Sequence, residues 1–516
     1  MQTEKEYLLT REICSLRCES TGEYSLPDYN GDVKKVLAIK TKVFPSGKYA
    51  LEDTLEFSGT VGYEVVYLDG ENNVTHAELS TDYEAAVKIN SESYVDADVN
   101  TSVSSCNVRL IGPRKLLVKA SLDNDVSICE RRSYEIAGDA FMEYEPETLS
   151  DIAKISSPCF AFGQSREISE EMTSIEGAIV DEVEVLISDA ELRVDQIEMG
   201  DGVALMRGDI VLSVLLKNAD QPPRLISKSL PYSEELAFSD AEGVHSLNGR
   251  GEISGLKSSV TPTEDGVSVS LSLSLTPKIR GKKDQSLCLI SDAYLKERAT
   301  ENEYSDFSYT EHLCTQTETG SFDERMPISE LGIDALGEVI YSEAQPRVEK
   351  CEMTDNGVKI QGEIRFSGIA CRVSDDDESS YAPVRFSMPF EHNVKLNCQI
   401  HSNMRAHCAV NANDVKINLD ENNVHASCTL DYYVTVNADK RSRCLGASYL
   451  CDEEYSRDDS VVTVYYPDSS ESLFSIAKRF HTSVSAIAEC NRLTESVFAS
   501  VGHPLGSLGV KKLIIK

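Results

Sequence analysis

The sequence has no Trp, and aromatic residues make up only 7% of its 516 residues. Proteins that read bases or sugars by stacking depend on aromatic rings, so this scarcity argues against such a reader. Basic residues are scarce too: 50 Lys and Arg stand against 86 Asp and Glu, a formal net charge of −36. Nucleic-acid binding needs cations that pair with phosphates, and anionic lipids repel a chain of this charge. We therefore expect no nucleic-acid partner and no attraction to a membrane surface.

Long apolar runs are also missing. No stretch of about 18 consecutive apolar residues occurs, so we expect no membrane insertion. The residues that open the sequence lack the apolar segment of a secretion signal. The 15 Cys are odd in number and form no C-x-x-C pair. This usage favours free thiols in a reducing cytoplasm over a secreted disulfide scaffold.

What the chain does contain is a repeat. Gly59, Gly208 and Gly362 each precede alternating apolar positions, the pattern of a half-buried strand. These glycines lie 149 and 154 residues apart, about one domain length. Residues 267–275 alternate apolar residues with Ser, a period of two that only a strand can use to bury one face. The predicted fold class is mainly β, with three repeated antiparallel, sandwich-like units.

Composition changes suggest where these units end. We predict units at residues 1–142, 169–298 and 328–455, separated by linkers at 143–168 and 299–327. The first linker has room for a short helix, and the second is polar and rich in Ser, Thr and Glu, as in a flexible joint. Apolar spacing over residues 328–342 predicts another short helix at the start of the third unit.

The C-terminal segment, residues 461–516, differs from the body in pattern and in charge. A strand is predicted at 461–466, and Leu473, Ile476, Ala477 and Phe480 then share one face of a helix. A second short helix and a strand at 513–515 complete a small β-α-α-β domain. The segment carries six basic and four acidic side chains, whereas the rest of the chain is strongly acidic.

The motif of this segment resembles a LysM domain. The resemblance rests on Ser472 to Phe480, on Thr482 to Val484, and on Asn491 followed by Leu493. It implies binding of N-acetylglucosamine chains in a shallow groove between the first-strand–helix loop and the second-helix–strand loop. Both loops depart from the usual pattern: Ser470 and Glu471 replace Gly-Asp, and residues 494–509 form a longer connection.

We place the partner or glycan contacts of this domain on its loops and on the first helix. Leu473 is expected in the core, while Phe474 lies off the apolar face and is expected at the surface. The predicted contact residues are Ser470, Ser472, Phe474, Asn491, Arg492 and Leu493.

The first unit resembles the SPOCS-domain spore coat proteins. The resemblance rests on two motifs: Leu26, Pro27, Asp28 and Tyr29, and Gly112, Pro113, Arg114 and Lys115. Asn30-Gly31 replaces the usual Cys-Pro of the family. SPOCS repeats that end in LysM imply a coat morphogenetic protein of the mother-cell cytoplasm. Such a protein links the coat to the forespore surface by holding the ATPase that polymerises as the base layer of the coat.

The two SPOCS motifs also have a simpler interpretation. Pro27 fixes φ and Asp28 can cap a turn, and the Gly112–Lys115 segment can be a turn with two solvated cations. Docking and turn formation both remain open for these residues.

Motifs of catalysis and metal binding give no firm signal. Cys398, His401, His407 and Cys408 are ligand types that zinc prefers, but alternation along a strand would turn His407 and Cys408 to opposite faces. No nucleophile, metalloprotease or phosphate-loop motif occurs. We predict a non-catalytic scaffold without cofactor or metal that docks the coat ATPase or another coat morphogenetic protein. The alternative is a protein that binds N-acetylglucosamine glycans of the spore cortex or cell wall.

Overall fold

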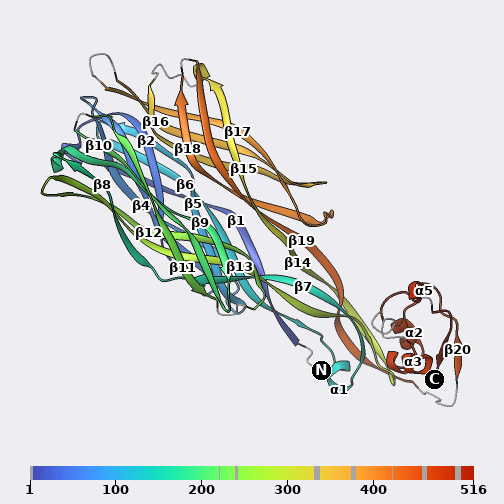
Figure 1. Ribbon diagram of the computed structural model, residues 1–516. Coiled ribbons are helices and arrows are strands. Elements are labelled where there is room, and N and C mark those ends of the chain that lie inside the picture. The colour runs from blue at the N-terminus through green and yellow to red at the C-terminus, as the bar shows by residue number, and fades with distance from the viewer. Residues whose placement is uncertain are drawn as a thin grey trace.

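Long antiparallel strands form most of the computed structural model, and a small helical domain stands at one end of the strand bundle, near the N-terminus (Figure 1). The structure describes residues 4–219, 221–238, 242–330, 337–373, 379–420, 422–455, 462–493, 501–508 and 510–516. The predicted fold class, mainly β with a small C-terminal β-α-α-β domain, is confirmed. Among these residues, no helix combines the length and apolarity needed to cross a membrane.

The strands of the body repeat one order three times: a long first strand, a short 3-10 helix, and five more strands. The first unit contains β1 (Glu4–Ser25), η1 (Asp28–Asn30), β2 (Val33–Leu51), β3 (Thr54–Asp69), β4 (Val74–Lys88), β5 (Tyr94–Gly112) and β6 (Lys115–Glu135). A short helix, α1 (Ala140–Glu143), leads to the second unit.

The second unit divides the long first strand in two. It contains β7 (Glu147–Phe162), β8 (Arg166–Glu176), η2 (Val180–Glu182), β9 (Val183–Met199), β10 (Val203–Asn218), β11 (Arg224–Ala237), β12 (Val244–Pro262) and β13 (Gly266–Tyr294). The third unit contains β14 (Arg298–Pro327), η3 (Ile328–Glu330), β15 (Glu338–Thr354), β16 (Gly357–Val373), β17 (Ser379–Lys395), β18 (Met404–Leu419) and β19 (Asn423–Glu454).

Each unit is a sandwich of two antiparallel sheets. One sheet has the order β2-β3-β4, β11-β10-β9 or β15-β16-β17, and the other has the order β1-β6-β5, β12-β13-β7 (with β8 also on β13) or β14-β19-β18. The central strands of the two sheets pack on each other, β3 on β6, β10 on β13 and β16 on β19. The alternation at residues 267–275 is one half of such a core, because Val267, Val269, Leu271, Leu273 and Leu275 are all buried in it.

The repeated glycine has a structural reason. Gly59, Gly208 and Gly362 lie in the central strands β3, β10 and β16, each beside a β-bulge in the neighbouring strand. The bulge brings a backbone carbonyl onto the glycine. A Cβ there would lie 2.5, 1.9 and 2.1 Å from the carbonyl oxygens of Phe44, Arg193 and Arg347, respectively. Only Gly fits such an approach, so the bulge makes Gly necessary at the same place in all three units.

The three units meet around a common axis through equivalent residues. Four positions before the three bulge carbonyls stand Lys40, Asp189 and Glu343, one in each unit. Lys40 Nζ lies 2.7 Å from Asp189 Oδ2 and 3.0 Å from Glu343 Oε1. Burial opposes the charge on Lys40, but the Glu343 and Asp189 carboxylates outweigh it and raise the pKa of this amine well above its usual value. One cation and two carboxylates therefore bind the units together where they converge.

Apolar residues extend this junction. Val66, Leu215 and Ile369 each stand seven positions after a repeated glycine, and all three are buried in one shared cluster. A second junction lies towards the ends of β6, β13 and β19, where the Tyr134 hydroxyl donates to the Leu445 carbonyl at 2.9 Å. The body is thus a single pseudo-threefold assembly and not a series of independent tandem domains.

The prediction of linkers at 143–168 and 299–327 is wrong. Strand β7 and the beginning of β8 occupy the first segment, and β14 fills the second. Among the described strands, β14 pairs with β19 alone, so it is a sheet edge held by backbone hydrogen bonds. Most of its side chains remain partly or fully exposed. Its polar composition therefore reflects an edge strand and not a flexible joint.

The short helices predicted beside these linkers also differ from the structure. Within 143–168 only the last residue of α1 is helical, and strand follows. Within 328–342 the structure has the 3-10 helix η3 and the beginning of β15, while residues 331–336 lie outside the described part of the chain.

Candidate docking module

The C-terminal domain has the β-α-α-β order that the sequence predicts. Its elements are β20 (Thr463–Tyr465), α2 (Leu473–Arg479), α3 (Val484–Asn491), α5 (Leu505–Leu508) and β21 (Leu513–Ile515). Strand β20 pairs with β21 in antiparallel fashion, and α2 and α3 pack against the core under this pair. The one-turn helix α5 is an addition that the sequence pattern does not predict.

Serine side chains fix where the two helices begin. Ser472 Oγ accepts from the Ser475 amide at 3.1 Å, and Ser475 Oγ accepts from the Ser472 amide at 3.0 Å, which is a capping box. Ser483 Oγ caps α3 in the same way by accepting from the Ala486 amide at 3.1 Å. Helix α3 ends at Arg492 in the left-handed conformation, with φ of 50°.

The predicted contact residues divide into exposed and structural ones. Ser470 and Arg492 are exposed, on the loop before α2 and at the end of α3. Asn491 is structural: its amide nitrogen donates to the Ile514 carbonyl, and its amide oxygen accepts from the Ile514 amide, both at 2.7 Å. Leu493 is partly buried against the domain core, and Ser472 serves as the helix cap.

Phe474 is not at the surface, as the sequence prediction had it. Its side chain is only 3% exposed. Leu473, predicted in the core, is fully buried. Phe474 does lie off the main apolar face, but Tyr294 at the end of β13 covers it, with ring centroids 5.2 Å apart in an edge-to-face arrangement.

Side chains at the end of β13, together with Leu149 of β7, attach this domain to the second unit. Besides the ring contact of Tyr294 with Phe474, the Tyr294 hydroxyl donates to the Thr482 carbonyl at 2.7 Å. Lys478 Nζ binds both carboxylate oxygens of Asp292 at 2.7 and 2.8 Å. Burial raises the pKa of Tyr294, which keeps its hydroxyl a donor. The domain is therefore held on the body at a defined place.

The two loops that flank the expected glycan groove are bound to each other. The Leu505 amide donates to the Glu471 carbonyl at 2.7 Å, and the Gly506 amide donates to the Ser469 carbonyl at 3.2 Å. A Cβ at Gly506 would lie 2.7 Å from that Ser469 oxygen, so the approach requires Gly. Helix α5 thus lies directly against the loop that precedes α2.

A second surface of the domain is apolar and exposed. Val462, Val464 and Tyr466, at and beside β20, are 53%, 48% and 70% exposed. They alternate along the chain and therefore share one face of the strand. Lys511 and Lys512, just before the partner strand β21, are exposed as well. The sequence prediction missed this surface, although the alternation from Val462 to Tyr466 was its signal.

The two SPOCS motifs form one corner of the first unit. The Leu26 amide donates to the Arg114 carbonyl, and the Val33 amide donates to the Pro113 carbonyl, both at 2.8 Å. Arg114 also forms ion pairs with Asp28 and, at 3.4 Å, with Asp32. The β5–β6 turn is therefore bound to the 3-10 helix η1, as expected of turn-forming segments.

The other residues of the two SPOCS motifs lie in or beside this corner. Leu26 is buried in the core of the unit, while Pro27 and Lys115 are exposed. Gly112 pairs with Lys115 across the hairpin. Tyr29 lies in η1, and its side chain lies outside the described part of the structure.

The candidate zinc ligands separate as the alternation predicts. Cys408 is buried in the core of the third unit, whereas His407 lines a cavity on the opposite face of β18. Cys398 instead contacts Cys314, with 3.3 Å between the sulfur atoms. No group of three or more His, Cys, Asp and Glu side chains within the described ranges is placed to hold a metal ion.

Between the second and third units, Ser246 and His312 lie together as a catalytic serine and its histidine base would. Ser246 Oγ lies 2.9 Å from His312 Nε2. However, Lys282 Nζ lies 3.1 Å from His312 Nδ1, and an ammonium can only donate. In the tautomer in which Nδ1 accepts from Lys282, the ring proton is on Nε2 and is donated to Ser246; Nδ1 also lies 3.3 Å from Asn437 Oδ1. Burial, followed by the charge of Lys282, lowers the pKa of His312 to about 4, so this imidazole is a poor base.

Two family models match the chain. Residues 32–111 match the SipL SPOCS domain, and residues 469–505 match the LysM domain. No curated protein and no solved structure matches it. The predicted combination of a SPOCS domain with a C-terminal LysM domain is confirmed. Both are binding-type domains, the first related to sporulation and the second of a peptidoglycan-binding type.

Proposed function

From a chain that joins a SPOCS domain to a C-terminal LysM domain, we propose a non-catalytic scaffold for endospore coat assembly. It acts in the mother-cell cytoplasm at the forespore surface. Its LysM domain docks a coat morphogenetic protein, the ATPase that forms the base layer of the coat, and the body gives this domain a fixed position.

The exposed apolar face of the LysM domain carries this proposal. Val462, Val464 and Tyr466 form an apolar strip of the kind that marks protein interaction sites. Tyr is enriched at such sites because its ring buries a large area at a small cost in conformational entropy. Lys511 and Lys512 next to the strip, in a chain with a net charge of −36, favour an acidic partner surface and speed its approach.

Glycan binding is the second candidate, and the match to the LysM domain favours it. The loop arrangement counts against the usual groove. A glycan lying between the two loops would have to displace the hydrogen bonds from Leu505 to Glu471 and from Gly506 to Ser469. A loss of about 1 kcal/mol for each bond would weaken glycan binding.

Co-purification from sporulating cells tests the two candidates together. Tagged full-length protein is expected to retain the base-layer ATPase, and the Val464→Glu variant is expected to lose most of it because a charge replaces an apolar contact. Leu51→Glu is the matched control, since Leu51 is 59% exposed on the first unit, away from the LysM domain. Arg492→Glu tests the loop surface that the sequence predicted.

The same proteins are then incubated with purified peptidoglycan. Retention of the ATPase that depends on Val464 supports protein docking. Retention on peptidoglycan without retention of any coat protein would refute the scaffold and favour the glycan-binding protein.

A further inference from the structure

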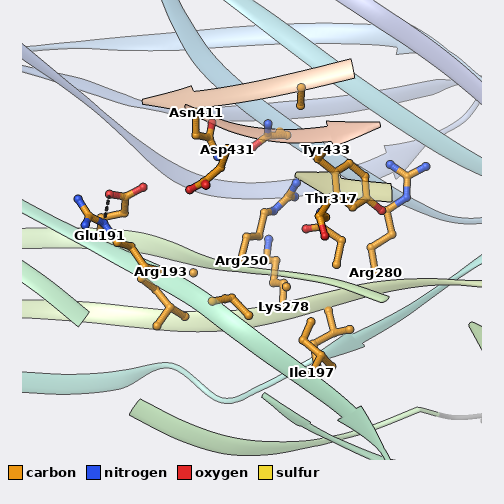
Figure 2. Close-up of a pocket in the computed structure, with 18 of the residues that line it drawn as sticks. Glu191, Arg193, Ile197, Arg250, Lys278, Arg280, Thr317, Asn411, Asp431 and Tyr433 are labelled. Atoms are coloured by element: carbon orange, nitrogen blue, oxygen red, sulfur yellow. Dashed lines mark hydrogen bonds and ion pairs between the residues drawn. The ribbon is translucent and has the colours of Figure 1, made fainter. Parts of the chain in front are cut away.

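A cavity of about 1180 Å³ lies between the three units of the body, away from the LysM domain (Figure 2). Strands β9, β12 and β13 of the second unit form one wall, and β18 and β19 of the third unit form the opposite wall. Residues of β2, β5 and β6 from the first unit close the side. The volume is of the size that holds a small-molecule or short oligomeric ligand.

The third-unit wall of the cavity is largely polar. Alternate residues of β19, among them Asp431, Tyr433 and Thr435, face the cavity. The residues between them, such as Leu430 and Val434, are buried in the sandwich core. Apolar clusters join the units at the two junctions, together with polar contacts such as that of Lys40 with Asp189 and Glu343. Along β19, side chains thus alternate between the cavity and the apolar core, and those that face the cavity are polar.

Several of these polar side chains have unused hydrogen-bonding capacity. The side chains of Asn411, Tyr433, Thr317 and Thr435 line the cavity; Asn411 and Thr317 are exposed and the other two are partly buried, and no hydrogen bond of these four side chains is found among the described residues. For the side chain of Asn248 on the opposite wall, no hydrogen bond is found among the described residues either. Amide and hydroxyl groups both donate and accept, so together they suit a ligand whose groups do the same.

The charges in the cavity are balanced. Seven Lys and Arg and eight Asp and Glu line it, in contrast to the strongly acidic chain as a whole. Many of them already form pairs: Arg250 binds Asp98 at 2.7 Å, and Arg193 binds Asp414 at 3.3 Å. A balanced and largely paired lining attracts neither an anion nor a cation strongly, and its polarity disfavours an apolar ligand.

We propose that this cavity binds a neutral, hydroxyl-rich ligand of the oligosaccharide class. Sugar hydroxyls would bond to the free amide and hydroxyl groups of Asn248, Asn411, Thr317 and Thr435. The ring of Tyr433 supplies a flat face against which a sugar ring can lie. This site is separate from the LysM domain and goes beyond the proposed docking function.

Isothermal titration of the full-length protein with maltotetraose and with chitotetraose tests the proposal. At least one of the two is expected to bind, and Asn411→Ala and Tyr433→Phe are each expected to weaken binding about tenfold, the loss of one or two hydrogen bonds. Both substitutions are small and leave the sandwich core intact. Asn418→Ala is the matched control, because Asn418 is exposed on the same strand beyond the cavity.

The outcomes separate this site from the LysM domain. Binding that falls with the cavity variants, while retention of the coat ATPase is unchanged, supports the proposal. Binding that neither cavity variant changes places the sugar elsewhere and overturns it, and so does the absence of binding by both probes at millimolar concentration.

Discussion

Single residues decide how closely the strands of each unit approach. The repeated glycine is the clearest case, because a bulge carbonyl occupies the place of its Cβ. Gly208→Ala is expected to destabilise the protein by about 1–3 kcal/mol, since the strand or the bulge must move. Urea unfolding measures the change. Gly255→Ala is the control, because its Cβ would meet only Ser274 Oγ at 3.7 Å. Equal stability of the two variants would show that the bulge does not require Gly.

Lys40 is the residue on which the axial junction depends. Lys40→Met leaves the partly exposed Asp189 and Glu343 carboxylates without their shared cation, at an expected cost of about 1–2 kcal/mol. The triple variant that also carries Asp189→Leu and Glu343→Leu removes all three charges and is expected to recover most of this loss. Chemical denaturation of the three proteins checks the expectation. If the triple variant is as unstable as the single one, shape and not charge holds the junction.

Glu184 makes the contact between the first and second units sensitive to acid. Burial by itself would raise the pKa of Glu184, but hydrogen bonds from His76 at 2.7 Å and Thr75 at 3.0 Å lower it below its usual value. A carboxyl group whose pKa is lower in the folded than in the unfolded protein stabilises the fold. Its full contribution is present when the pH is above the pKa of the unfolded state. That contribution disappears as the pH falls through the folded-state value.

We therefore expect Glu184→Gln to cost about 1 kcal/mol at pH 7 and nearly nothing once the pH is well below the ordinary value of 4.5. Unfolding free energies measured from pH 7 to pH 3 test this trend. Glu182→Gln, at an exposed neighbouring position, is expected to have little effect at any pH. A difference between Glu184→Gln and wild type that grows on acidification would contradict the assignment.

At the scale of elements, the contact between β13 and the LysM domain is the most specific expectation. Tyr294→Ala removes a buried ring and the hydrogen bond to Thr482, and it uncovers Phe474. We expect faster hydrogen exchange of the α2 amides and a loss of about 3–5 kcal/mol in the stability of the contact. Tyr449→Ala, which changes a ring that is 41% exposed, serves as control. Unchanged exchange in α2 would mean that the contact does not hold the domain.

Some elements can be predicted from the sequence, because their pattern is local. Gly followed by alternating apolar residues identifies β3, β10 and β16, and the helical spacing of Leu473, Ile476 and Ala477 identifies α2. Strand β14 has no such pattern, since a sheet edge is held by backbone bonds and tolerates polar side chains on both faces. The sequence pattern of this segment alone therefore predicts a linker in place of strand β14.

Contacts between distant segments are what a single sequence does not reveal. The burial of Phe474 depends on Tyr294, and the junction of Lys40, Asp189 and Glu343 depends on the superposition of three units. The predicted contact residues Asn491 and Ser472 are motif positions that maintain the domain itself. Motif membership alone does not separate structural residues from those that face a partner.

At the scale of the whole molecule, three sandwiches share two junctions and carry the LysM domain at one end. A body of this kind moves as a unit, so it can keep the docking face of the LysM domain at a fixed distance and orientation from any other contact. Flexible linkers would leave that geometry undefined. The scaffold proposal depends on this rigidity.

Hydrogen exchange of the full-length protein, comparing Gly208→Ala with wild type, tests this rigidity most directly. If the body is one cooperative assembly, weakening β10 in the second unit will also lower the protection of the central strands β3 and β16 in the first and third units. Loss of protection confined to the second unit, with β3 and β16 unchanged, would show three independent domains and contradict the account.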